Sequence, residues 1–139
     1  MIDQSNIRQK LGDDDPYVRR DACEAIGEAR ALDFIQDLVR LLKDEHPGVR
    51  ESALNALTSI GGQHVAEAIA PLLKLEDVAL RNIGIEILRQ LGPEALETLS
   101  GLLTYKDDDV VKFAIDILAS IGETEAALLE EHSAGLGLD

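Results

Sequence analysis

The chain is poor in aromatic residues, cysteine and proline, and these scarcities exclude several kinds of protein. Its 139 residues include one cysteine, four prolines, no tryptophan and only 3% aromatic residues. A single cysteine cannot form an internal disulfide, which is consistent with a reducing compartment. No apolar run is long enough to cross a membrane, and the first residues lack the basic and apolar regions of a signal peptide. We therefore expect a cytoplasmic protein with an aliphatic core and no membrane contact.

Basic residues are also scarce. Thirteen lysines and arginines stand against 27 aspartates and glutamates, which gives a formal net charge of −14. Such a surface repels phosphate backbones, so we expect no nucleic-acid partner. The charge suits a partner protein with a basic segment, or it serves solubility alone.

An internal repeat dominates what the sequence does contain. Its opening residues are Val18, Val49, Leu80 and Val110, about 31 residues apart. Apolar residues follow each of them at steps of three or four, as on one face of a helix, and a second amphipathic segment follows in the first three units. A small residue stands four places after each opening residue, where two helices of one unit would approach closely. The pattern predicts an all-α superhelix of about four helix pairs, with Asp3–Leu11 as an N-terminal capping helix.

The spacing also predicts boundaries within the chain. We expect one domain at residues 1–132, with repeats at about 15–43, 46–74, 77–104 and 107–131, and a flexible tail at 133–139. Gly61, Gly92 and Gly122 stand twelve residues after an opening residue and predict helix ends, whereas the first unit has Arg30 there. Pro71 lies inside a predicted second helix, which it should kink or shift in its start.

Two apolar residues occupy positions that are polar in the earlier units. Ile83 and Phe113 stand where Asp21 and Ser52 stand before them. This change indicates a contact surface, for example with a second copy of the chain. The alternative, which we favour, is that a C-terminal helix at Glu123–Glu131 folds over them.

The units resemble HEAT repeats of the phycobilisome-lyase type. Val18-Arg19-Arg20-Asp21-Ala22 and Val49-Arg50-Glu51-Ser52-Ala53 carry the likeness, and Leu80-Arg81 continues it; the fourth unit departs from it, with Val111 and Lys112. The likeness covers roughly residues 11–131. It implies that the second helices line a concave surface. It also implies that Arg19, Arg50 and Arg81 form a ladder, each tying its unit to the aspartate-rich loop of a neighbour; otherwise each arginine merely covers its own helix end.

The resemblance also raises enzymatic possibilities, which the residues weaken. Some relatives are iron-dependent hydroxylases with His-Glu pairs near the opening residues, but no His-Glu dipeptide occurs here. His64, with Asp33 and Glu94 at similar depth on flanking helices, is better read as a solvated side chain than as a metal ligand. Cys23 has apolar counterparts in the later units, which favours an inert packed thiol over one that attaches or transfers a bilin. We expect no catalytic, cofactor or metal site.

The remaining hypothesis is a non-catalytic scaffold that binds a basic or amphipathic segment of another protein against the second helices. A bilin lyase-like enzyme or enzyme subunit is the alternative, by resemblance alone. The candidate contact residues project from the outer side of the second helices. They are Asp33, Gln36, Asp37, Arg40, His64, Glu67, Pro71, Glu94, Glu97 and Thr98.

Overall fold

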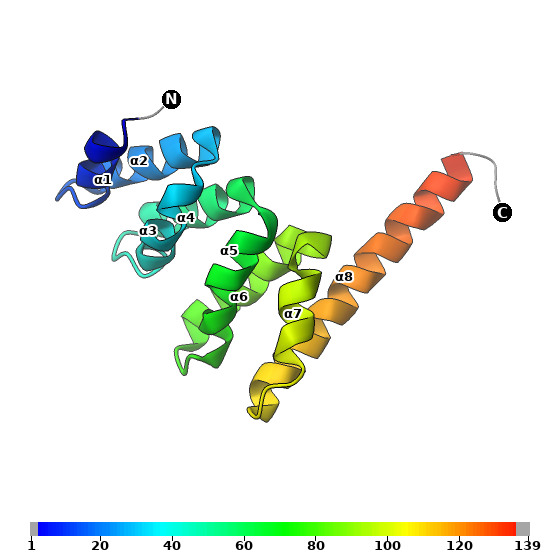
Figure 1. Cartoon of the computed structure of the whole chain (residues 1–139). Coiled ribbons are helices and arrows are strands. Elements are labelled where there is room, and N and C mark those ends of the chain that lie inside the picture. The colour runs from blue at the N-terminus through cyan, green and yellow to red at the C-terminus, as the bar shows by residue number, and fades with distance from the viewer. Residues whose placement is uncertain (1–2, 136–139) are drawn as a thin grey trace.

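The protein is an α-α superhelix in the computed structural model, which describes residues 3–135 (Figure 1). Along the chain a first helix and a second helix alternate as α2 and α3, α4 and α5, and α6 and α7, with α1 before them and α8 after them. Each second helix packs on the first helix of the next unit. The bounds are α1 Gln4–Leu11, α2 Pro16–Ala29, η1 Leu32–Phe34, α3 Ile35–Leu41, α4 Pro47–Ile60, α5 Gly62–Ile69, η2 Ala70–Lys74, α6 Val78–Leu91, η3 Gly92–Ala95, α7 Leu96–Leu102 and α8 Asp108–Gly135. The predicted all-α solenoid with an N-terminal capping helix is confirmed.

The first helix of each pair begins at a side-chain cap in the preceding loop. The Asp15 carboxylate accepts from the backbone N–H of Tyr17, and the Asp77 carboxylate accepts from the N–H of Leu80. Each cap satisfies a donor that the helix itself leaves unpaired. The helices therefore start at equivalent points of the repeat, which keeps their apolar faces in register.

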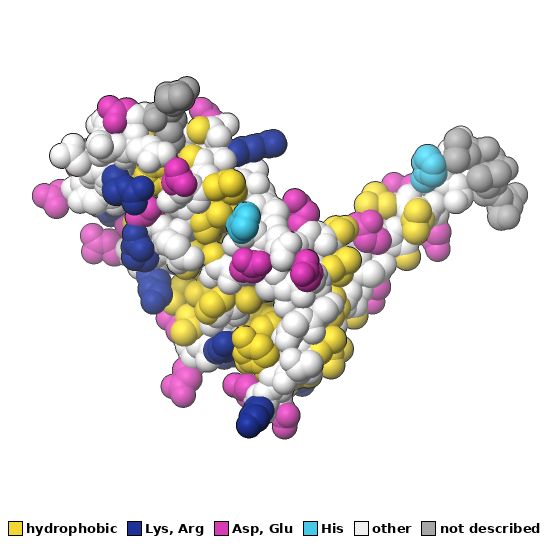
Figure 2. Space-filling view, viewed as in Figure 1, with side chains coloured by type: hydrophobic (Ala, Val, Ile, Leu, Met, Phe, Trp, Pro, Cys, Tyr) yellow, Lys and Arg dark blue, Asp and Glu magenta, His cyan; other side chains and the backbone are white. Residues whose placement is uncertain are grey.

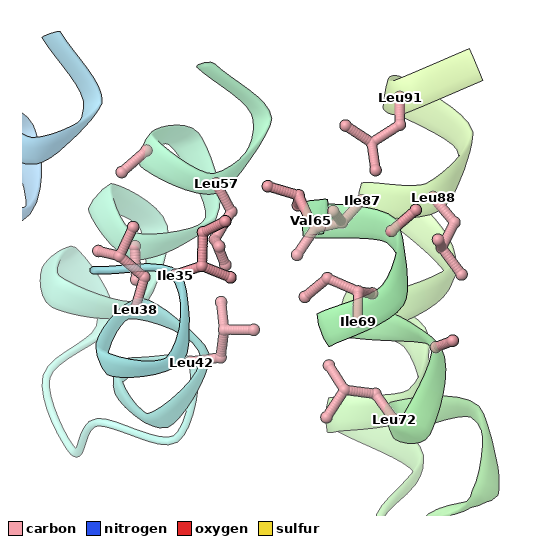
Figure 3. Close-up of a cluster of buried hydrophobic side chains, with 14 of the residues drawn as sticks. Ile35, Leu38, Leu42, Leu57, Val65, Ile69, Leu72, Ile87, Leu88 and Leu91 are labelled. Atoms are coloured by element: carbon pink, nitrogen blue, oxygen red, sulfur yellow. The ribbon is translucent and has the colours of Figure 1, made fainter. Parts of the chain in front are cut away.

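An aliphatic ridge runs through the stacked pairs and forms a continuous core (Figure 3). The side chains labelled there are all buried: Ile35, Leu38, Leu42, Leu57, Val65, Ile69, Leu72, Ile87, Leu88 and Leu91. They come from successive helix pairs, so each pair completes the burial of its neighbour. This is the nearest-neighbour packing of a solenoid.

The small residue in the middle of α6 allows close packing, although not at the predicted place. A Cβ added to Gly84 of α6 would lie 2.9 Å from Leu72 Cβ. Leu72 belongs to η2 of the preceding unit, whereas the sequence pattern placed this contact between two helices of one unit. The close approach therefore joins neighbouring repeats.

The turns between paired helices follow the glycine pattern in two units. Gly61 and Gly92 have φ values of +63° and +60°, a backbone region that glycine enters at little cost, which confirms both predicted helix ends. In the first unit Arg30 takes the left-handed conformation, with φ of +50°. α5 ends at Ile69 and the 3₁₀ turn η2 begins at Ala70, so Pro71 lies just after the end of an α-helix and not inside one.

The prediction for the fourth unit is wrong. α8 runs through Gly122 without a break, so Glu123–Glu131 is not a separate helix and does not fold over Ile83 and Phe113. Gly61 is followed by a second glycine and Gly92 by Pro93, whereas Gly122 is followed by Glu123, a good helix former. Of the predicted flexible tail, residues 133–135 belong to α8, and residues 136–139 lie outside the described part.

Candidate protein-binding face

The helices α3, α5 and α7 lie side by side on one face of the molecule (Figure 1). We call this surface the second-helix face, and it carries all ten candidate contact residues. Eight of them have exposed side chains, whereas Asp37 and Thr98 are half-buried. The repeat thus presents one polar row per unit, as the sequence pattern predicts.

The α1 end of this face is already engaged within the chain. Gln4 Nε2 donates to Asp33 Oδ2 over 2.8 Å, and Arg8 Nη1 donates to Asp37 Oδ2 over 3.0 Å. Arg40 also donates to Asp37, whose side chain is 12% exposed. Asp33 is therefore hydrogen-bonded to the neutral amide of Gln4, whereas the charge of Asp37 is partly neutralised by Arg8 of α1 and by Arg40 of its own helix.

At the opposite end of the face the acidic side chains are exposed to solvent. Glu67 on α5, Glu94 on η3 and Glu97 on α7 all have exposed side chains. Among the described residues the hydrogen-bond and ion-pair partners of Glu67 are Gln63, which donates to it over 3.1 Å, and His64, whose Nδ1 lies 4.0 Å from its Oε2. Figure 2 shows acidic side chains over α5 and α7, and both acidic and basic side chains over α1 and α3. The acidic side chains at the α1 end of the face are therefore accompanied by basic ones.

Two shallow hollows lie on the second-helix face and share one residue. The first lies between α3 and α5, with a volume of about 480 Å³, and includes Ile35, His64 and Glu67. The second lies between η2 and α7, with a volume of about 280 Å³, and includes Glu67, Pro71 and Tyr105. Each hollow has apolar walls and charged edges. Glu67 stands on the ridge between them.

The second hollow contains residues that sequence reasoning missed. Lys74 Nζ lies 3.3 Å from Tyr105 Oη and 4.4 Å from the centroid of that ring. Thr98 Oγ1 is buried without a hydrogen-bond partner among the described residues, and Gly101 leaves open space beside it. Lys74 and Tyr105 are 31 residues apart, which is one repeat. That spacing was the signal that could have paired them.

The residues considered for chemistry are not arranged for it. Within residues 3–135, no three histidine, cysteine or acidic side chains are placed to hold a metal ion, and His64 is strongly exposed. Cys23 is fully buried, and this burial raises the pKa of its thiol to about 12. A thiol that stays protonated at neutral pH is a poor nucleophile. No helix in the described part is both long and apolar enough to span a membrane.

The three arginines share one contact and differ in another. Each donates to a backbone carbonyl of the loop before its own helix: Arg19 to Asp13, Arg50 to Asp44 and Arg81 to Leu75. Among the described residues only Arg19 also reaches a carboxylate of the next loop, donating to both oxygens of Asp44 over 2.9 and 3.0 Å. Leu75 occupies the equivalent position one repeat later. We call the Arg19–Asp44 contact the carboxylate rung. It forms because the next loop has an aspartate at this position, where the loop one repeat later has Leu75.

Removing this rung is expected to destabilise the first two repeats. Burial by itself raises the pKa of Asp44, but hydrogen bonds from Arg19 and from the backbone of His46 outweigh burial, and the pKa is lowered. A lowered folded-state pKa contributes stability above the unfolded value of about 3.9, and this contribution is lost as the pH falls through the folded value. Arg19→Ala should lower Tm more than Arg50→Ala at pH 7. The Tm difference between the native chain and Asp44→Asn should shrink below about pH 4. Equal losses from the two arginine variants would contradict the rung.

Ile83 and Phe113 do not form an open apolar patch. Both are half-buried and pack against the core. The guanidinium carbon of Arg81 lies 5.0 Å from the centroid of the Phe113 ring, at the distance of a cation–π contact. Arg81 and the core therefore supply much of the cover that was expected from a C-terminal helix.

Comparison with known proteins identifies the repeat. A family model described as HEAT repeats matches residues 5–86. Two crystal structures of engineered proteins are similar to the chain, each at 21% identity and a TM-score of 0.48. Both matches cover 84% of this chain, which spans 61% of the length of one and 36% of the other. No sequence among the curated proteins matches the chain.

Proposed function

The chain belongs to the HEAT-repeat family, and from this premise we propose that it is a non-catalytic scaffold that binds a partner protein through the second-helix face. The observation that carries the proposal is the pair of adjacent hollows that share Glu67. Apolar side chains form their walls, and no competing site for chemistry was found in the described part. The phycobilisome-lyase-type subtype and a cytoplasmic setting belong to this proposal; the buried free thiol of Cys23 suits a reducing compartment.

The partner segment we propose is amphipathic and basic. Neighbouring helices in such a stack lie about 8–10 Å apart, so the two hollows can receive apolar side chains at about that separation. Residues two turns apart on a helix match this distance, at about 1.5 Å per residue. A lysine or arginine between these two apolar residues of the partner helix would lie close to Glu67, and further basic residues would lie close to Glu94 and Glu97. The proposed contact runs from the hollow between α3 and α5 to the exposed carboxylates on η3 and α7, and it leaves out Asp37, which Arg8 of α1 already engages.

A lyase-like activity receives no comparable support. The resemblance that suggested it points to Cys23 as the thiol. That thiol is fully buried and has its pKa raised to about 12. Bilin attachment there would require the first helix pair to open.

Charge reversal on the ridge should release the partner. Affinity capture with the chain, followed by mass spectrometry, would identify a stoichiometric protein, whose affinity is then measured by isothermal titration calorimetry. We expect Glu67→Lys to weaken binding about tenfold, which corresponds to about 1.4 kcal/mol, and the triple reversal at Glu67, Glu94 and Glu97 to abolish it. Raised salt should weaken binding as well, because these charges are exposed to solvent.

The matched control is Glu51→Lys, which makes the same charge change at an exposed position on α4. It should leave the affinity unchanged, since α4 lies outside the second-helix face. If Glu67→Lys binds the partner as tightly as the native chain does, this face is not the contact. If both variants weaken binding equally, net charge rather than the hollows governs the interaction.

A further inference from the structure

Apolar residues at equivalent positions of the repeats are buried in the first two units and exposed at the α7 end of the array. The residue fourteen places before the next opening residue is Ile35, Ala66 or Leu96, with 7%, 0% and 41% exposure. The residue seven places before it is Leu42, Leu73 or Leu103, with 1%, 1% and 41% exposure. In both sets only the α7 residue is uncovered.

The fourth first-type helix shows the same loss of cover. Ile26, Leu57 and Leu88 are fully buried, whereas the equivalent Leu118 of α8 is half-buried. Within residues 3–135, no further second-type helix packs against α7 and α8. We call Leu96, Leu103 and Leu118 the open end face, because each lacks the cover that its equivalents receive.

The chain also carries a helix without a surface to pack on. Residues 123–135 of α8 stand away from the array, and Leu128 and Leu129 are 54% and 67% exposed (Figures 1 and 2). This projecting segment follows Gly122 where a fourth second helix would follow its turn. Thr124 Oγ1 donates to the Ser120 carbonyl within α8, on the two sides of Gly122. While α8 is straight, the projecting segment leads away from the open end face of its own chain.

We propose that a second copy of this chain supplies the missing helix. The projecting segment of each copy packs on the open end face of the other, in the position of a fourth second helix. The exchange is reciprocal, so a two-fold axis relates the two copies, and the open end face of each copy is covered in the same dimer. The projecting segment of one copy would thus cover the exposed leucines of the open end face of the other copy, and it would gain an apolar surface to pack on.

The expected dimer is weak and sensitive to salt. A helix of about 13 residues is about 20 Å long and about 10 Å across. Two reciprocal contacts of that footprint bury roughly 800 Å² in total, below the size of a stable standard interface. Each copy also carries a formal charge of −14, with Glu123, Glu125, Glu130 and Glu131 on the projecting segment. Screening of this repulsion should favour association, so raised salt should tighten the dimer.

Sedimentation equilibrium of the full chain tests the exchange. The native chain should associate at high micromolar concentration, and more strongly at 0.5 M than at 0.05 M salt. Leu129→Glu, on the projecting segment, and Leu103→Glu, on the open end face, should each weaken association at least tenfold. An equimolar mixture of the two variants should recover part of it, because one of the two contacts is then intact. Leu32→Glu alters a leucine of similar exposure on η1 and should have no effect.

Cross-linking decides which chain the helix covers. In the double variant Leu96→Cys with Leu128→Cys, mild oxidation should give a covalent dimer on a non-reducing gel. A covalent monomer would show instead that α8 bends at Gly122 and covers its own chain, which would overturn the proposal. A native chain that stays monomeric to millimolar concentration would overturn it as well, and would leave the open end face to a different protein.

Discussion

Replacing Gly84 by valine is expected to lower the free energy of unfolding by about 3 kcal/mol and Tm by roughly 10 °C. The first atom added to Gly84 would lie 2.9 Å from Leu72 Cβ, closer than real Cβ contacts. Leu72 Cβ is bonded to the backbone of η2, so no rotation of the leucine side chain can move it away. The valine would therefore push α6 and η2 apart in the middle of the array, and thermal unfolding followed by far-UV circular dichroism measures the loss.

The control for this substitution is Gly122→Ala. Gly122 is also helical, but an added Cβ meets nothing within 4 Å there. Alanine should stabilise α8 by up to about 1 kcal/mol, because it restricts the unfolded chain and has the higher helix propensity. Opposite signs at the two glycines are expected. If Gly84→Val costs no more than a few tenths of a kcal/mol, the contact between repeats is looser than the structure indicates.

The same contact links stability to the proposed binding surface. η2 packs with its buried side on α6 and carries Pro71 and Lys74 on its outer side, at the edge of the second hollow. A displacement of η2 by Gly84→Val would reshape that hollow without altering any residue that lines it. Partner affinity should thus fall together with Tm in this variant, whereas Glu67→Lys should lower affinity with Tm almost unchanged.

The features that repeat along the chain were predictable from the sequence. The spacing of the opening residues, the aliphatic face and the glycines at 61 and 92 each recur, and each has a local physical cause. The end of α5 just before Pro71 is local too, since proline removes one backbone donor. These features depend on residues within a few positions of one another, which is why a single sequence sufficed to place them.

Two features were not predictable from the repeat pattern: the continuation of α8 past Gly122, and the partners of the acidic side chains on η1 and α3. Gly122 occupies the same position as Gly61 and Gly92, but the residue that follows it determines whether the helix ends. Asp33 and Asp37 project as expected, yet their partners Gln4 and Arg8 lie 29 residues away on a helix that the pattern marked only as a cap. The sequence therefore predicted which side chains project from the second helices, but it could not show which of them are already engaged by α1.

Replacing Phe34 by alanine is expected to detach the α1 end of the array. Phe34 is the largest fully buried side chain, and the Arg8 guanidinium carbon of α1 lies 4.8 Å from the centroid of its ring. Truncation of a buried phenylalanine costs about 3–5 kcal/mol, most of which would fall on the first helix pair. Because a solenoid unit contacts only its neighbours, this loss should release α1, α2 and α3 before the rest of the array.

Hydrogen exchange measured by mass spectrometry separates this local loss from global unfolding. In Phe34→Ala, amides of residues 4–41 should lose protection, whereas those of α6 and the first half of α8 should keep it. Phe34→Leu retains most of the volume and should cost less than about 1.5 kcal/mol. Release of α1 would also free Asp33 and Asp37 from Gln4 and Arg8, which extends the acidic surface toward α3. Uniform loss of protection across all helices would mean that the repeats unfold as one unit, contrary to nearest-neighbour packing.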